Sequence, residues 1–135
     1  MTEIEELLAQ LKELDPETYR DFREICAMTA FDSSDLDDPN ITTPVYGWCL
    51  QGVIQDAIAA RGWGFYVSTE CDNWWEAENI SDMEITFAAS ILLPDDEMYD
   101  FWDGLQLEWC RGDSPAEALL RAYNAALEAE REAGR

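Results

Sequence analysis

Apolar residues recur at helical spacing through the first thirty positions of the chain. A helix over residues 2–14 would carry five of them on one side: Ile4, Leu7, Leu8, Leu11 and Leu14. Asp15-Pro16 predicts a restart, because Asp suits the N-cap and Pro the first helical position. A second helix is therefore expected to reach about Phe31, with Phe22, Ile25 and Cys26 on its inner side. The segment 2–31 is thus predicted to be a helical pair.

Two more helices are predicted further along the chain. Thr43-Pro44 opens a helix over 44–61, which Gly62 ends where a left-handed cap is needed. Its inward residues are expected to be Trp48, Cys49, Val53, Ile54, Ala57 and Ile58. Ser114, Pro115 and Glu117 then combine an N-cap, a first-turn proline and a capping-box acid. They predict the start of a helix over 115–132.

Between these helices the apolar period changes from 3.6 to 2, the spacing of strands with one buried face. In "WGFYVST" the alternating set is Trp63, Phe65, Val67 and Thr69. In "MEITFAASILL" it is Met83, Ile85, Phe87, Ala89 and Ile91, and in "LQLEWCR" it is Leu105, Leu107 and Trp109. A further short strand is expected around residues 74–78. The pattern predicts an α+β fold with a three- to four-stranded antiparallel meander, packed by helices 44–61 and 115–132. We expect one domain over 1–135, with the helix–sheet–helix core over 44–132.

Two segments within residues 49–129 resemble small phage and prophage proteins of the α-β-α sandwich type. The resemblance lies in "AIAARGWGFYV", where a helix ends at Gly-Trp and enters a strand, and in "WCRGDSPAEALLRAYNAALEA". These motifs are caps and packing residues, so no functional residue is implied. The resemblance implies a small accessory protein of a virus or mobile element, for which anti-defence work is one of the possible roles.

The net charge is extreme. Thirty acidic residues against eight basic ones give −22, and residues 24–110 hold eighteen acids with one base, Arg61. The chain is 47% hydrophobic, which argues against disorder despite this charge. No apolar run is long enough for a membrane span, and the acidic N-terminus does not resemble a secretory signal. We therefore expect a cytoplasmic protein, in the host cell if it is phage-encoded.

The sequence does not contain the residues that several kinds of catalysis and metal binding require. Histidine is absent, which excludes Ser-His-Asp and Cys-His catalysis, and no glycine-rich phosphate motif is present. The four cysteines have no zinc-type spacing, and the aspartates of 32–40 do not match a calcium loop. The four cysteines are expected to be reduced thiols, although one or two disulfides remain an alternative in an oxidising compartment. We predict no enzyme activity, no metal, no cofactor and no direct binding of nucleic acid.

Aromatic residues stand inside the two most acidic stretches, "TECDNWWEAENISDMEI" and "DDEMYDFWDG". If residues 74–78 form a strand, Trp74 and Trp75 point to opposite faces, so one ring is exposed. Exposed rings would supply short-range binding energy while the carboxylates steer a basic partner. The predicted contact residues are Glu70, Asp72, Trp75, Glu76, Glu78, Asp82, Asp95, Asp96, Glu97, Tyr99, Asp100, Trp102 and Asp103.

The favoured function is recognition of a basic protein surface that normally binds nucleic acid. Twenty-two charges correspond to about 37 Å of duplex DNA, near the roughly 35–40 Å diameter expected for this chain. The partner would be a nuclease or other defence effector, blocked by a DNA mimic such as an anti-CRISPR or anti-restriction protein. Three alternatives stay open: salt adaptation, which one lysine among eight bases also fits; an immunity-type inhibitor of a basic toxin; and a small carboxylate-based hydrolase. The oligomeric state is also open.

Overall fold

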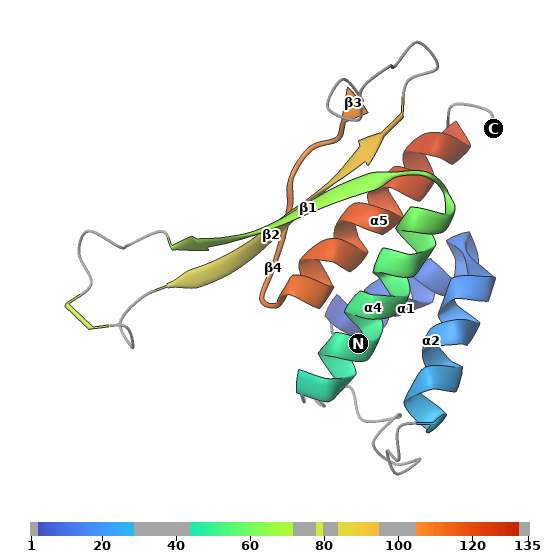
Figure 1. Ribbon diagram of the computed structural model, residues 1–135, viewed down its shortest axis with the longest axis horizontal. Coiled ribbons are helices and arrows are strands. Elements are labelled where there is room, and N and C mark those ends of the chain that lie inside the picture. The colour runs from blue at the N-terminus through green and yellow to red at the C-terminus, as the bar shows by residue number, and fades with distance from the viewer. Residues whose placement is uncertain (1–2, 29–43, 72–77, 80–83, 95–104, 133–135) are drawn as a thin grey trace.

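A computed structural model describes residues 3–28, 44–71, 78–79, 84–94 and 105–132. Its helices are α1 (Glu3–Leu14), α2 (Pro16–Met28), α4 (Pro44–Ala60) and α5 (Pro115–Glu132). Its strands are β1 (Gly64–Cys71), β2 (Ile85–Leu93), β3 (Leu105–Gln106) and β4 (Cys110–Gly112). Figure 1 shows the sheet on one side of a group of helices. The α+β class, the antiparallel meander and the N-terminal helical pair are confirmed, whereas most of the strand expected around 74–78 lies outside the described residues.

β2 is the central strand of the sheet. β1 pairs along its full length, from Gly64 opposite Leu92 to Cys71 opposite Ile85. Both β3 and β4 pair with the other edge of β2, so they are two parts of one interrupted third strand. The order β1-β2-β3 follows the sequence, as expected for strands with short connections.

The interruption in the third strand is a bulge. Gln106 lies opposite Leu92 and Cys110 opposite Ala89, so three residues on the third strand face two on β2. The extra residue shifts the alternation of side chains. Leu107 and Cys110 both pack against the core, and Trp109, which we expected on the same face as Leu107, is 47% exposed instead. The strict period of 2 was therefore wrong at this point.

The core lies between the sheet and α5. Leu119, Leu120 and Tyr123 of α5 have no exposed surface, and they pack with Ile54 and Ile58 of α4. α5 crosses β2 and β4, and α4 contacts the start of β1. A side chain at Gly112 in β4 would meet the backbone nitrogen of Ala118 at 2.6 Å, so only glycine permits this approach of strand and helix.

The helix ends follow the signals in the sequence. Gly62 has a φ of 75° and closes α4 in the left-handed conformation. Ser114 caps α5, accepting a hydrogen bond from the Glu117 backbone at 3.1 Å, and the Glu117 carboxylate accepts one from the Asp113 backbone. Asp15 caps α2 in the same way, through the Thr18 backbone.

A polar network joins the N-terminal pair to the rest of the molecule. Asp15 accepts hydrogen bonds at 2.6 Å from both the Thr18 hydroxyl and the Tyr123 hydroxyl, and the latter accepts one from Arg61 Nε at 3.1 Å. Burial alone would raise the pKa of Asp15, but these hydrogen bonds and Arg61 hold it below its ordinary value. Burial and the bond to Asp15 raise the pKa of Tyr123 to about 12. α1 packs on α5 and α2 on α4, so the four helices form one body.

Two residues that we expected on inner helix faces lie at the surface. Trp48 on α4 is 69% exposed, and Ile25 on α2 is 39% exposed. Val53, Ile54 and Ile58 already fill the contact between α4 and the core. An α4 that is apolar on most sides therefore cannot bury every apolar residue it carries.

Candidate functional site

Most of the predicted contact residues fall outside the part of the chain that the structure describes. Of the thirteen, Glu70 and Glu78 are described. The other eleven lie in segments 72–77, 80–83 and 95–104, and their prediction stays as it was. The described strands nevertheless show what these segments connect to: 72–84 joins β1 to β2, and 94–104 joins β2 to β3.

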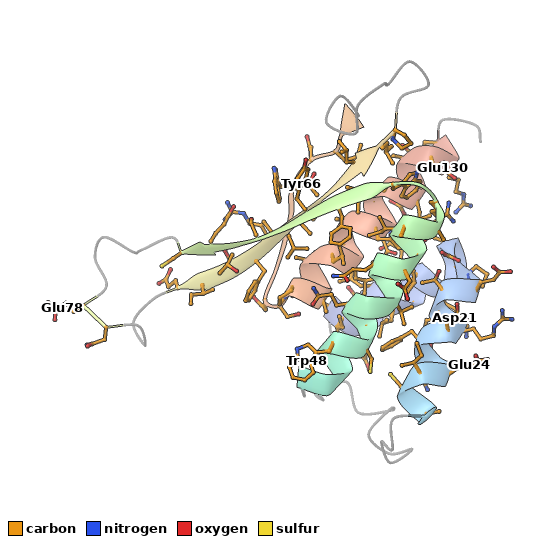
Figure 2. The ribbon with its side chains drawn as sticks, in the orientation of Figure 1. Asp21, Glu24, Trp48, Tyr66, Glu78 and Glu130 are labelled. Atoms are coloured by element: carbon orange, nitrogen blue, oxygen red, sulfur yellow. The ribbon has the colours of Figure 1, made fainter. Side chains whose placement is uncertain are left out.

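The β1–β2 hairpin extends beyond the helices. In Figure 1 the outer end of this hairpin runs away from α4 and α5, whereas Phe87 of β2 still packs against the core. Thr69 is exposed and Ile85 is 47% exposed, although both are on the helix-facing side of the strands. Figure 2 places Glu78 further out still, beyond the end of both strands. Glu78 therefore lies away from the body of the protein.

The sheet also has an open face, defined as the side opposite α4 and α5. On β1 it carries Tyr66, Ser68 and Glu70, which alternate with the core-facing Phe65 and Val67. No helix among the described residues covers this face (Figure 1). The β1 side chains on this face are partly exposed, whereas Ala88, Ser90 and Leu92 of β2 on the same face are buried.

Two aromatic rings meet on the open face. Tyr66 and Trp109 lie with their ring centroids 6.3 Å apart, in a tilted arrangement. Tyr66 is directly opposite Ser90 in the register, and Ser90 has no exposed surface. Figure 2 shows Tyr66 on the side of the sheet away from the helices. The pair forms an apolar patch that is half open to solvent.

We did not predict Tyr66 or Trp109 as contact residues, and a signal for Trp109 was present in the sequence. In "LEWCRG", Leu107 and Cys110 are three apart and Gly112 follows two later. A bulge puts Leu107, Cys110 and Gly112 on the core side and leaves the intervening Trp109 on the other. Regular alternation, on which our prediction rested, puts the large ring on the core side instead.

Next to the rings, Glu70 on β1 forms an ion pair with Arg111 on β4, with their charged atoms 3.1 Å apart. The pair spans the open face across β2, and the Arg111 side chain is 61% exposed. An ion pair this exposed contributes little to stability. Its main effect is to reduce the charge that Glu70, one of the predicted contact residues, offers to a partner.

The charge is distributed unevenly between sheet and helices. Residues 64–113 hold thirteen acidic residues and one basic residue, Arg111. The rest of the chain holds seventeen acids and seven bases, and several of these bases are in ion pairs. Arg61 pairs with Glu130 at 3.3 Å and Arg121 with Glu3 at 2.9 Å. The uncompensated negative charge is therefore densest in the sheet and its connections.

A groove of about 370 Å³ lies elsewhere, between α1, α5 and β4. Its polar groups mostly satisfy one another: Asn124 donates to the Leu7 carbonyl at 3.0 Å, and Arg121 donates to Glu3 and Glu117. Asn124 Oδ1 and Arg121 Nε have no hydrogen-bond partner among the described residues, but both atoms are sealed from solvent. The groove is thus part of a polar interface between α1 and α5.

Within the described residues, no three cysteine or carboxylate side chains gather closely enough to hold a metal ion. None of the described helices is long and apolar enough to cross a bilayer. Comparison of the chain with protein-family models, curated proteins and solved structures found no match.

Proposed function

We propose that this protein binds the basic surface of a nucleic-acid-binding protein through the open face of its sheet and the adjoining acidic connections. The observation that carries the proposal is the coincidence of two features in one region. Residues 64–113 have a net charge of −12, and they include the half-exposed Tyr66–Trp109 pair on the open face. The protein acts by occupying its partner and has no catalytic role.

The charge density of this region is comparable with that of DNA. Twelve charges correspond to about 20 Å of duplex, and the nine residues of β2 span about 30 Å. Ten of the thirteen acidic residues of this region belong to the connections 72–84 and 94–104, so these connections would supply most of the field that a basic groove meets. The resemblance of residues 49–129 to phage proteins favours, among such partners, a nuclease of a bacterial defence system.

The exposed carboxylates and the two aromatic rings would contribute to binding in different ways. Exposed carboxylates steer a cationic partner and raise the association rate, but screening limits their share of the affinity. The Tyr66 and Trp109 rings offer apolar area and a surface on which arginine stacks. The affinity is therefore expected to depend most on the rings, and the rate of association on the acids.

The partner class can be tested by capture. The immobilised protein is exposed to a bacterial lysate at about 50 mM salt, and bound proteins are eluted with duplex DNA or with about 200 mM salt. We expect nucleic-acid-binding proteins, released by both treatments. A bound set that duplex DNA does not displace would reject mimicry of a duplex. Absence of binding together with a large gain of stability in molar salt would support salt adaptation.

The location of the surface is tested with two charge-matched variants. Glu78→Gln/Glu84→Gln/Glu108→Gln removes three charges from the sheet side, and Glu17→Gln/Asp21→Asn/Glu24→Gln removes three exposed charges from α2. Figure 2 shows Glu78 at the far end of the β1–β2 hairpin, and Asp21 and Glu24 on the opposite side of the molecule. We expect the first variant to slow association with the captured partner several-fold, and the second to change it little. Equal slowing by both would show that overall charge, and not this surface, governs binding.

A further inference from the structure

The two edges of the sheet differ in length and regularity. One edge is the third strand, which is divided by its bulge into β3 with two residues and β4 with three. The other edge is β1, whose eight residues pair with β2 without interruption. β1 ends the strand order, and β2 is its only partner among the described strands. A short, bulged edge hinders pairing with another chain, whereas a long, regular edge is a template for it.

The register shows which backbone groups of β1 point away from the sheet. The Leu107 backbone nitrogen donates to the Ile91 carbonyl at 2.9 Å, so Ile91 directs its backbone groups toward the third strand. Phe65 is opposite Ile91, and these two residues therefore share no hydrogen bond. Because the direction alternates along a strand, Phe65, Val67 and Thr69 direct their N–H and C=O groups away from β2. Within the described part of the chain, no hydrogen bond reaches these outward groups.

β1 lacks the features with which edge strands usually prevent pairing with another chain. It contains no proline and no lysine, and its one charged side chain, Glu70, forms an ion pair with Arg111. Phe65 and Val67 are half-buried against the core, so each keeps part of its apolar surface accessible. A strand added beside β1 would therefore gain backbone hydrogen bonds and apolar contacts together.

The charge around β1 determines which kind of strand would be attracted to it. Residues 64–94 hold six acidic residues and no basic one, and Glu78 and Glu84 among them are exposed. A second copy of this chain would bring another net charge of −22, which the first copy repels. A basic segment would be attracted by the same acidic residues. Charge complementarity therefore favours a basic partner over a dimer.

We propose that the outer edge of β1 is a docking site for an extended segment of a basic protein, in which apolar and basic residues alternate. The segment would add an antiparallel strand to the sheet through the outward backbone groups of Phe65, Val67 and Thr69. The basic character of the partner rests on the function proposed above. The added strand specifies how that partner is held.

The alternation of the segment follows from the two sides of β1. In an antiparallel pair, residues opposite each other have their side chains on the same side of the sheet. Apolar side chains of the segment would lie beside Phe65 and Val67, and the backbone groups of these apolar residues would make the hydrogen bonds to β1. Its basic side chains would lie on the open face, where the Tyr66 ring offers a surface for arginine.

The first experiment uses the full chain and a capped synthetic peptide of eight residues in which arginine and valine alternate. Backbone amide hydrogen exchange is measured by NMR with and without the peptide. In the protein alone, the Tyr66 and Ser68 amides should be protected by β2, and the Val67 and Thr69 amides should exchange rapidly. The peptide should slow exchange at Val67 and Thr69 by at least about tenfold. Unchanged exchange of these two amides in the presence of bound peptide would overturn the proposal.

Two control peptides separate pairing of the backbone from attraction of charge. Replacing two of the valines by proline keeps the charge but removes backbone donors, and replacing the arginines by glutamate keeps the alternation but reverses the charge. Both should bind at least about tenfold more weakly. Tight binding of the proline peptide would overturn the proposal and leave the proposed function intact, because the acidic surface would then recognise charge alone.

Two variants of the chain test the edge directly. Thr69→Pro removes one outward N–H and leaves the hydrogen bonds to β2, whereas Thr69→Ala changes the same exposed side chain and keeps the N–H. We expect Thr69→Pro to weaken binding of the arginine–valine peptide by about tenfold and Thr69→Ala by less than about twofold. Equal binding by the two variants would overturn the proposal.

Hydrogen exchange of the unaltered chain decides the matter even if Thr69→Pro does not fold. Protection of Val67 and Thr69 that grows with protein concentration, without any peptide, would show that a second copy occupies the edge and would overturn the proposal. Salt distinguishes the two occupants further. Added salt should weaken binding of the basic peptide, whereas it should strengthen association between two chains of the same charge.

Discussion

Aromatic and charged residues have different surroundings in the helical body and on the open face of the sheet. In the body, Arg61 and Arg121 bind carboxylates, and Tyr123 is fully buried with its hydroxyl hydrogen-bonded to Asp15. On the open face, Tyr66 and Trp109 remain accessible, and one exposed arginine, Arg111, is the only base in residues 64–113. In the body, these aromatic and charged groups hold the four helices together. On the open face, Glu70 and Arg111 also form an ion pair, but Arg111 and Trp109 remain exposed.

This contrast shows that net charge alone describes the molecule poorly. The chain outside residues 64–113 carries more acidic residues than this segment, seventeen against thirteen, but it also carries seven of the eight bases. Compensation within the body reduces its field, and the sheet with its connections keeps most of its own. If the contrast is correct, variants in the body should change stability, and variants on the open face should change binding.

The largest expected effect is in the body. Leu119→Ala removes a fully buried side chain of α5 from the centre of the core and leaves a cavity. We expect the free energy of unfolding to fall by about 3 kcal/mol, measured by denaturant titration. The control is Ala125→Ser at an exposed position of α5, which should cost a few tenths of a kcal/mol. A similar small loss for Leu119→Ala would show that α5 is not the centre of the core.

An intermediate effect is expected for Asp15→Asn. The carboxylate accepts three hydrogen bonds, from the Thr18 backbone and hydroxyl and from Tyr123, and an amide cannot accept them all. We expect a loss of about 2 kcal/mol at neutral pH. Because the pKa of folded Asp15 is below its ordinary value of 3.8, its stabilising effect is complete above that value and is lost as the pH falls through the folded pKa.

The pH dependence distinguishes this role from simple packing. The difference in unfolding free energy between the unaltered chain and Asp15→Asn should shrink when the pH is lowered from about 6 to about 3. A difference that stays constant over this range would mean that the charge of Asp15 contributes nothing. Comparing the two proteins at each pH removes the effect of the other carboxylates, which titrate in both.

The smallest effect on stability is expected on the open face. Trp109→Ala should cost about 1 kcal/mol, since the ring is 47% exposed and its removal opens no enclosed cavity. It should weaken binding of the captured partner by at least tenfold, as for a central aromatic contact. Trp48→Ala is the matched control, because Trp48 is also exposed but lies on α4. Equal weakening by both variants would remove the distinction between the two regions.

Local signals in the sequence predicted the elements well. The pairs Asp15-Pro16 and Ser114-Pro115 mark the starts of α2 and α5, and Gly62 marks the end of α4. Each signal acts through hydrogen bonds or backbone angles within four residues, so it needs no knowledge of the fold. The α+β architecture followed from the change of apolar period between these helices.

The candidate surface was predicted less well, for a physical reason. The acidic character of residues 70–103 is visible in the sequence, but the exposure of a ring depends on what packs beside it. Trp48 and Trp109 both fall on apolar patterns, and both are at the surface. One residue added to the third strand is enough to exchange the faces of the side chains that follow.

The sequence by itself determined the helices, the strands, their caps and the concentration of negative charge in the middle of the chain, because these depend on neighbours along the backbone. Only the tertiary structure decided that Tyr66 meets Trp109 on the face of the sheet opposite the described helices, and that Asp15 binds Tyr123. Each of these contacts joins residues that are distant in sequence. Their geometry is set by how whole helices and strands pack, and no local pattern contains that information.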